Sequence, residues 1–449
     1  MATTYSLSAT GERNTAVDEV VATELVEKWT AEVEEAPEGA ILDKVDLSER
    51  TYTVEGAKVI AEFLTPLAEN VVVAQLNDVI ASRPEAEGLE ILSTLCTIFA
   101  NSTLTRVVLS DNALGNKGID ACRSVIADQP HLQELELLNN GLSKESMQLL
   151  SEIFKGSVHL RKLHFCNNMV GPKGAKFAGE ILSTCPNLVS IRYAQCRQGR
   201  EGTLSILQGL EGKYSLVELD LDGSIIDEGG KEEEEEKADT LTPLCNVLCV
   251  QPSLTHLNLK DCNLGTNGMT RVSEALLESN AKLIFLDVGC NELGPTPCSA
   301  LADLLRANLQ TLRTFKCEEN EITFVGIERI MAVYTDEENV LEELFLTTNE
   351  LGHRAAVALT AAVLPSLRQI HLDGNEFEFR DVQRLMDTFG DKLQEMGEND
   401  SLDGEEEESG EEEDEDEEEK EGGEEEEKEK EDDEFEPLTQ FFSQNVIFD

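Results

Sequence analysis

The chain has 449 residues, 40% of them hydrophobic, and its 91 acidic against 36 basic residues give a formal net charge of −55. Such a charge argues against direct nucleic-acid binding, which needs a basic surface, and against docking on anionic membranes. The length suits two or three domains or one repeat array. The 11 cysteines include no C-x-x-C pair, so we expect reduced thiols, no metal site and an intracellular protein.

The N-terminal part predicts a helical or loose segment over 1–43, centred on "AVDEVVATELVEKWTAEVEEA", followed by a repeat domain over 44–396. Two degenerate units open that domain, "KVDLSERTYTVEGAKVIAEFL" and "VVVAQLNDVIASRPEAEGLEILSTLCTIFAN", and the first is expected to cap the array. The start of the chain lacks the apolar core of a signal peptide, and no stretch is typical of a membrane span.

Ten regular units follow, beginning with "LTRVVLSDNALGNKG" at Leu104, "LQELELLNNGLSKES" at Leu132 and "LRKLHFCNNMVGPKG" at Leu160, each 28 residues after the last. They share the pattern L-x-x-L-x-L-x-x-N/C-x-L of the leucine-rich repeat. With the degenerate units this makes about 12 repeats. A unit of this length holds a short strand and a full helix. We therefore predict an α/β solenoid, a ribonuclease-inhibitor-like horseshoe with parallel strands on the concave face and helices on the convex face.

An asparagine recurs at the ninth position of the pattern, where an inward amide can bond turn backbone that would otherwise be buried unpaired. Cys196, Cys262 and Ser224 replace it in three repeats. The predicted structural asparagine ladder consists of Asn112, Asn140, Asn168, Asn291, Asn320, Asn349 and Asn375.

Three segments depart from the repeat. The acidic insertion "GGKEEEEEK" at 229–237 is predicted to be a solvated, mobile loop. A second acidic block holds 26 acidic residues and 3 lysines between Asp400 and Glu436, so a disordered tail is predicted over 397–436. The last segment, 437–449, is short and apolar, and it is either a docking motif or a free end.

Enzyme motifs are missing: the sequence holds no GxxxxGK[ST], GxSxG or HExxH. A horseshoe without such a motif is by default a protein-binding surface. Three features stand out on it. Arg83 lies in the irregular loop "LNDVIASRPEAEGLEIL". Arg106, Lys162, His164 and Arg192 occupy outward strand positions and form an island of positive charge. Asn139 precedes the ladder residue Asn140 and points outward at the rim.

These features resemble the Ran GTPase-activating protein family, in which a horseshoe of 28- to 29-residue leucine-rich repeats precedes a very acidic tail. The resemblance covers roughly residues 44–436. Its most specific parts are "DVIASRPEAEGLEIL", similar to the plant-type arginine loop, and "LSDNALGNKGI" followed 28 residues later by "LELLNNGLS". It implies that Arg83 is the arginine that the activity requires and that Asn139 is the rim asparagine that acts on the GTPase.

The resemblance implies a GTPase activator without an active site of its own. Such an activator acts in trans and without an arginine finger, so that Ran's own glutamine orients the attacking water. No cofactor is expected, because GTP and Mg²⁺ are carried by the partner. The expected partners are Ran with GTP and, in addition, a Ran-binding protein. The residues expected to contact Ran are Arg106, Asp111, Lys162, His164, Asn167 and Arg192.

The same resemblance implies a monomer in the cytoplasm that serves nucleocytoplasmic transport, with no membrane contact; a perinuclear position stays open. The acidic tail is expected to contact basic proteins or to keep the protein soluble. The targeting domain of plant members and the modifier-accepting domain of animal members are not recognised in the sequence. Three alternatives remain: an acidic leucine-rich-repeat histone chaperone, whose repeats are shorter; a ribonuclease-inhibitor-like binder, whose family is richer in cysteine and has no acidic tail; and a generic protein-binding scaffold.

Overall fold

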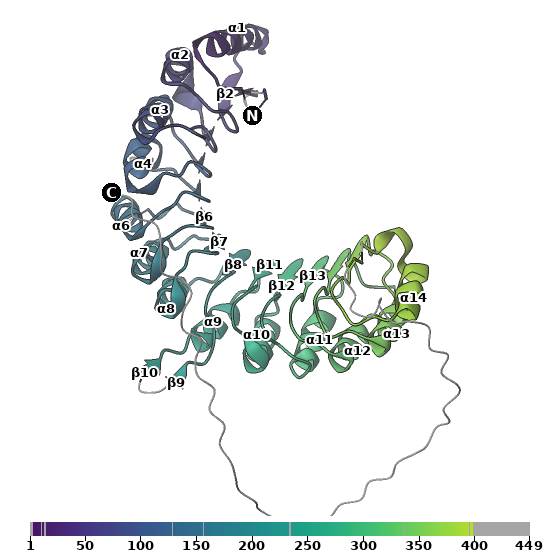
Figure 1. The fold of residues 1–449 in the computed structure, drawn as a ribbon. Helices are drawn as coiled ribbons and strands as arrows, with labels where there is room; N and C mark the ends of the chain where they lie inside the picture. The colour runs from purple at the N-terminus through teal and green to yellow at the C-terminus, as the bar shows by residue number, and fades with distance from the viewer. Residues whose placement is uncertain are drawn as a thin grey trace, which may run out of the picture. The chain divides into compact units, whose positions relative to one another are not determined.

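The computed structural model in Figure 1 describes residues 3–9, 11–12, 15–127, 129–155, 157–232, 235–335, 337–394 and 396–397. All of them belong to one compact unit, Met1–Asp403. None of the helices in these ranges has the length and hydropathy of a membrane span. Apart from residue 397, the predicted acidic tail (397–436) and apolar segment (437–449) lie outside the described residues.

The core of this unit is one parallel sheet whose strands follow the order of the chain, with the strands along the concave face and the helices along the convex face (Figure 1), as predicted. Its thirteen strands are β1 (Thr4–Ser8), β2 (Ile41–Asp46), β3 (Val73–Gln75), β4 (Arg106–Val108), β5 (Glu134–Glu136), β6 (Lys162–His164), β7 (Ser190–Arg192), β8 (Glu218–Asp220), β11 (His256–Asn258), β12 (Phe285–Asp287), β13 (Thr314–Lys316), β14 (Glu343–Phe345) and β15 (Gln369–His371).

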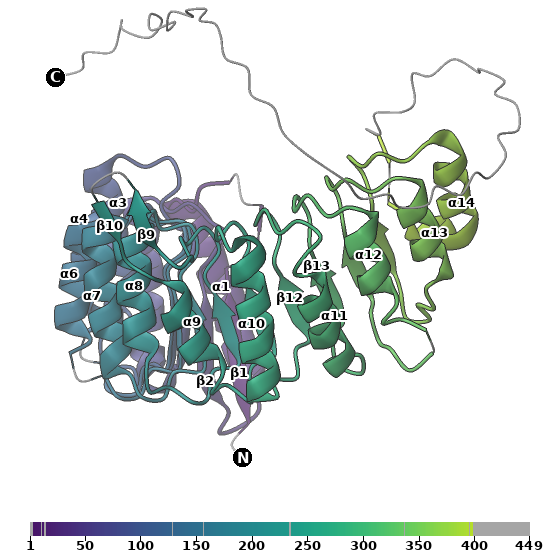
Figure 2. The same ribbon diagram turned by 90° about the horizontal axis from the view of Figure 1, so that it is seen from below.

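The helices stand side by side along the outer face (Figure 2). The α-helices are α1 (Glu19–Glu35), α2 (Val54–Leu64), α3 (Glu85–Thr97), α4 (Gly115–Ala121), α5 (Arg123–Ile126), α6 (Lys144–Ile153), α7 (Gly171–Thr184), α8 (Gly199–Leu210), α9 (Leu241–Leu248), α10 (Gly265–Ser279), α11 (Cys298–Ala307), α12 (Phe324–Met331), α13 (His353–Ala361) and α14 (Phe379–Phe389). Two 3-10 helices, η1 (Thr65–Asn70) and η2 (Gly390–Lys392), complete the set in the described ranges.

Each short strand directs its middle residue into the core and its first and third residues toward the concave face, because side chains alternate along a strand. In β5, Leu135 is fully buried and pairs in register with Leu163 of β6, while Glu134 and Glu136 are half-buried. No single repeat could cover its own leucines. Stacking of neighbouring repeats buries them in a continuous core.

The array begins earlier than the predicted boundary at residue 44. Strand β1 adds a parallel strand to β2, and Asp18 caps the start of α1 by accepting hydrogen bonds from the backbone of its first turn. Trp29 of α1 is fully buried, and its ring Nε1 donates to Ser8 O over 3.2 Å. Strand β1 and helix α1 therefore form a further unit that covers the first predicted repeat, which agrees with the helical rather than the loose alternative.

The insertion at 229–237 also differs from the prediction of a mobile loop. Its backbone forms an antiparallel hairpin of β9 (Gly230–Glu232) and β10 (Glu235–Lys237). At the base of the hairpin, the guanidinium of Arg200 pairs through both terminal nitrogens with the Asp227 carboxylate. The hairpin follows the turn after β8 and precedes α9, so it leaves the array at the rim where strands lead into helices.

Candidate protein-binding site on the rim and the concave face

The rim turns that follow β4, β5 and β6 carry a row of hydrogen-bonded polar side chains, which we call the rim row: Asp111, Asn139 and Asn167. Asn139 Nδ2 donates to Asp111 Oδ1 over 2.6 Å, and Asn167 Nδ2 donates to Asn139 Oδ1. All three residues are exposed. The amide of Asn139 is thus held from both sides, and it faces solvent.

The backbone conformation of the rim turns also favours asparagine and aspartate in the rim row. Asp111, Asn139 and Asn167 have φ angles of 63°, 53° and 56°, in the left-handed region. Asparagine and aspartate enter this region more readily than other residues with a side chain. The residue type at Asn139 therefore has a conformational reason as well as a chemical one. Sequence reasoning found the outward register but missed the left-handed turn.

The ladder asparagines lie one residue further along, and all seven are buried. Each donates to a carbonyl of the preceding repeat and accepts from a backbone N–H of that repeat. Asn140, for example, donates through Nδ2 to Leu109 O over 3.1 Å and accepts from Asn112 N over 3.0 Å. Where Ser224 replaces the asparagine of the next repeat, the buried Gln198 side chain accepts from the Cys196 N–H instead, over 3.2 Å.

Arg83 lies in a loop that is longer than the neighbouring turns. Five residues lie between Val79, which stands at the ladder position, and the start of α3 at Glu85, whereas two lie between Asn112 and the start of α4 at Gly115. The Arg83 side chain is 20% exposed, and its Nη1 lies 3.4 Å from Glu87 Oε1 on α3. Arg83 is therefore half-buried against its own helix, and it is not a free surface guanidinium.

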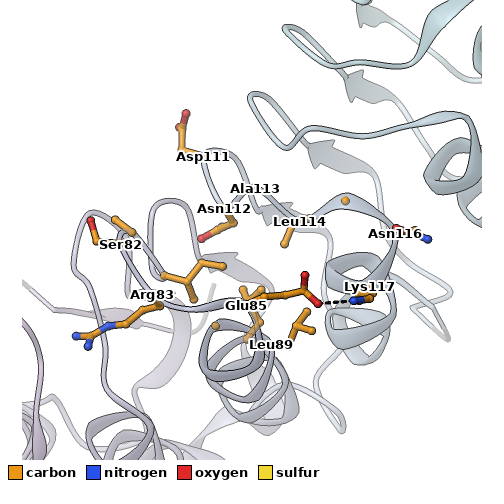
Figure 3. A pocket seen from close by; sticks show the side chains of 15 residues that line it. Ser82, Arg83, Glu85, Leu89, Asp111, Asn112, Ala113, Leu114, Asn116 and Lys117 are labelled. Carbon is orange, nitrogen blue, oxygen red and sulfur yellow. Dashed lines mark hydrogen bonds and ion pairs between the residues drawn. The ribbon is translucent and has the colours of Figure 1, made fainter. Parts of the chain in front are cut away.

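A cavity of about 540 Å³, which we call the rim pocket, opens between this loop and the turn that follows β4. Its lining includes Ile80, Leu89 and Leu92 on one side and Asp111 to Lys117 on the other. Figure 3 shows Glu85 reaching across to Lys117, whereas the Arg83 side chain points away from the cavity. Asp111 belongs both to this pocket and to the rim row, so the two features are continuous.

Arg106 and Lys162 lie on the concave face of β4 and β6, with the glutamates of β5 between them. Arg106 Nη2 lies 3.1 Å from Glu136 Oε1, and Arg106 Nε lies 3.4 Å from Glu134 Oε2. Lys162 Nζ lies 3.0 Å from the same Glu136 oxygen. Burial would raise the pKa of Glu136, but Lys162 and then Arg106 outweigh it and hold that pKa below its usual value. The prediction of an island of positive charge is wrong, because the carboxylates of Glu134 and Glu136 compensate the charges of Arg106 and Lys162.

His164 is not the outward-facing contact residue that the sequence predicted. It is only 3% exposed, and its Nε2 lies 2.8 Å from Ser190 Oγ, which donates to Glu218. The imidazole of His164, then the hydroxyl of Ser190 and the guanidinium of Arg192, outweigh burial and lower the pKa of Glu218 to about 2. Arg192 itself pairs with Asp220 over 2.9 Å. His164 is thus a buried member of a hydrogen-bonded chain and offers little surface to a partner.

Two further features escaped the sequence interpretation. Met169, one residue past the ladder, is 62% exposed beside the rim row. On the concave face further along, Lys316 Nζ lies 4.4 Å from the centre of the Phe345 ring, which stacks on His371 at 4.1 Å. Lys316, Phe345 and His371 are the third residues of their strands, and Met169 directly follows the ladder residue Asn168. Their positions in the repeat pattern could have identified them as outward-facing.

Comparison with known proteins places the chain among leucine-rich-repeat proteins. A family model described as "Leucine Rich repeat" matches residues 100–121 and 250–273. The chain is 40% identical over 95 residues to RAN GTPase-activating protein 1 of Arabidopsis thaliana, and 33% identical over 97 residues to RAN GTPase-activating protein 2 of that plant. These stretches cover 21% and 22% of this chain and 18% of each relative.

Two further comparisons give partial matches. NACHT, LRR and PYD domains-containing protein 12 of Mus musculus is 32% identical over 174 residues, which cover 37% of this chain and 15% of that protein. A chain of the yeast Rad7 and Elc1 complex has a TM-score of 0.49 at 15% identity, covering 84% of this chain and 90% of that one. The similarity thus spans less than a fifth of each of the three sequence relatives, and the likeness to Ran GTPase-activating proteins is partial.

Proposed function

We propose that this protein is a GTPase-activating protein for Ran and that Asn139 is the residue that acts on the bound GTPase. The observation that carries the proposal is the fixed, exposed amide of Asn139. An asparagine amide has two N–H donors and two oxygen lone pairs, and the described contacts to Asp111 and Asn167 use one of each. One donor and one acceptor remain for a partner.

Such an amide suits the orientation of a glutamine side chain in Ran. It can accept from the glutamine amide and donate to its carbonyl without adding charge near the phosphates, while Ran supplies GTP, Mg²⁺ and the glutamine that positions water. Holding a catalytic group in its reactive geometry lowers a barrier without new chemistry. The side chains of the rim row are already ordered against one another, so little reorganisation is needed on binding.

Arg83 has a supporting part in this proposal. Its guanidinium lies against Glu87 and points away from the rim pocket (Figure 3), so it is not placed as a finger toward the rim row. Instead it holds the long loop 80–84 against α3, and this loop forms one wall beside Asp111. The partial identity with the two Arabidopsis RAN GTPase-activating proteins supports the proposed GTPase-activating role in general, without reference to Arg83. The proposal includes a cytoplasmic location and a role in nucleocytoplasmic transport.

The test is single-turnover hydrolysis of GTP by purified Ran, with and without the full-length protein. The proposal expects a large acceleration that saturates with increasing protein concentration. A second small GTPase, treated in parallel, measures specificity. If the wild-type protein leaves Ran's hydrolysis rate unchanged at all concentrations, the proposed function is wrong.

A further inference from the structure

The rim pocket exists because the repeat that carries it breaks the regular spacing. The loop between Val79 and α3 has three more residues than the next turn, and Ser82 within it has a left-handed φ of 61°. The loop therefore stands away from the turn that follows β4. A cavity of about 540 Å³ is left between them.

The lining of the rim pocket is apolar at its base and polar at its mouth. Leu89 and Leu92 of α3, together with Ile80 and the buried Leu114, supply aliphatic surface. At the mouth, the charges of Glu85 and Lys117 meet each other rather than an open cavity (Figure 3). This arrangement favours a large apolar side chain, since the polar groups at the mouth already have partners.

The position of the pocket indicates whose side chain it takes. Asp111 lies at the mouth and also accepts the hydrogen bond from Asn139. A side chain held in the pocket would therefore fix its own polypeptide one repeat away from the Asn139 amide. Deep, well-packed apolar anchors of this kind carry most of the binding energy in protein interfaces.

Charge complementarity limits the partner further. Glu85 and Glu87 of α3 are compensated by Lys117 and Arg83. Asp111 accepts from the neutral amide of Asn139, so its carboxylate remains as the acid at the mouth, and the whole chain has a net charge of −55. A partner surface with basic residues beside its apolar anchor would be attracted to such a rim, and basic charge speeds the encounter.

We infer that the rim pocket is the anchor site for the GTPase: it takes one large aliphatic or aromatic side chain from a basic loop of the partner. The inference rests on the proposed function and deepens it, since it separates binding from catalysis. The anchor at the rim pocket sets affinity, and Asn139 sets the rate within the complex.

The test uses two pocket-filling variants of the full chain. Leu89→Phe extends a half-buried side chain of α3 into the cavity, and Asn116→Trp covers the mouth from an exposed position on α4. Leu277→Phe is the matched control, because Leu277 is a half-buried leucine on α10, in a distant repeat. Binding is measured with Ran loaded with a non-hydrolysable GTP analogue, hydrolysis in single turnover, and folding by the thermal midpoint.

Both pocket variants are expected to weaken binding at least about tenfold while reaching the wild-type hydrolysis rate at saturation, whereas Leu277→Phe binds normally. Unchanged affinity in both pocket variants, at an unchanged thermal midpoint, overturns the inference and leaves the proposed function standing. A lower saturating rate with normal affinity overturns it too. If wild-type protein neither binds Ran nor accelerates its hydrolysis, the proposed function fails and the inference falls with it.

Discussion

Asn139 and Asn140 are neighbours in sequence, yet they lie in opposite environments. Asn140 belongs to the ladder and is fully buried, and its side-chain amide bonds to backbone groups of the preceding repeat. Asn139 belongs to the rim row, is exposed, and bonds to side chains of the adjacent repeats. Both rows repeat with the same 28-residue period here. The same amide group is structural in one row and available to a partner in the other.

The difference shows that residue type alone does not assign a role in a repeat protein. A buried amide whose partners are backbone groups is costly to remove, because those groups then stay unpaired. An exposed amide can be removed at low cost, because water replaces its partners. The variants below test this separation, beginning with the largest expected effect.

Asn140→Ala is expected to destabilise the array by about 1–3 kcal/mol, since it leaves the Asn112 N–H buried without its acceptor and removes one of the two amide donors to the Leu109 carbonyl. Urea unfolding followed by circular dichroism measures the loss. Asn291→Ala is the matched ladder variant in a distant repeat, and its amide makes the same kind of bonds to Cys262 N and Leu259 O. Both should lose similar stability, but Asn291→Ala should keep Ran activation. A ladder variant of wild-type stability would contradict the structural role.

Arg83→Ala is expected to lower the activation of Ran about tenfold and to change the free energy of unfolding by less than about 1 kcal/mol, as for other solvent-screened ion pairs. Such a loss of activation without a loss of stability would show that Arg83 serves function rather than folding, as we propose for Asn139. Single-turnover hydrolysis and urea unfolding are measured on the same preparation. Glu87→Gln, which removes the partner of Arg83, should show a weaker form of the same loss. An unchanged hydrolysis rate with Arg83→Ala would show that Arg83 has no part in the activation of Ran.

Glu218 gives a pH-dependent effect on the concave face, away from both asparagine rows. Its pKa in the folded protein is about 2, below that of an ordinary glutamate, so the ionised form stabilises the fold above pH ~4.5 and loses this effect as pH falls toward 2. Glu218→Gln should cost less than about 1 kcal/mol at pH 7, where solvent screening is strong.

The difference between wild type and Glu218→Gln should shrink as the pH falls from 4.5 to 2, as measured by urea unfolding at several pH values. Glu278→Gln, an exposed position on α10, is the control and should show no such pH dependence. A difference that stays constant over this range would mean that the contacts of Glu218 with Ser190 and His164 do not stabilise its charge.

The smallest stability effect is expected for Asn139→Gly, within about 0.5 kcal/mol of wild type. Glycine adopts the left-handed φ of 53° without strain, and the lost hydrogen bonds are exposed. Asn139→Ala is less suitable, because alanine would add conformational strain of about 1 kcal/mol there. Unfolding in urea compares the two. A large loss in Asn139→Gly would make Asn139 structural, like Asn140.

The repeat architecture could be predicted from sequence because every unit restates it. The inward apolar positions and the ladder position each recur in ten units from Leu104 onward. Strand β1 was missed because "TYSLS" carries no leucine-rich pattern, and only its pairing with β2 places it in the array. Helix α1 lies inside the stretch for which a helical or loose segment was predicted. The hairpin at the insertion was missed because a run of glutamates suggests a solvated loop.

The candidate site was predicted less completely. Register identified Asn139 as outward and Asn140 as inward, because both depend on position along one chain. Charge compensation could not be predicted in this way. Glu136 neutralises Arg106 and Lys162 only because β4, β5 and β6 lie side by side, and the burial of His164 likewise depends on its cross-strand neighbours. The rim pocket arises from a difference in loop length between two repeats.

The most direct test is the saturating single-turnover rate of Ran's GTP hydrolysis with wild type, Asn139→Gly and Glu319→Gly. Glu319 stands at the same rim position in a distant repeat, is exposed, and has a similar left-handed φ of 51°. Asn139→Gly is expected to lower the saturating rate at least about 100-fold, a loss similar to that caused by removing one transition-state hydrogen-bond donor from an enzyme. Glu319→Gly should match wild type. A wild-type rate with Asn139→Gly would contradict the account.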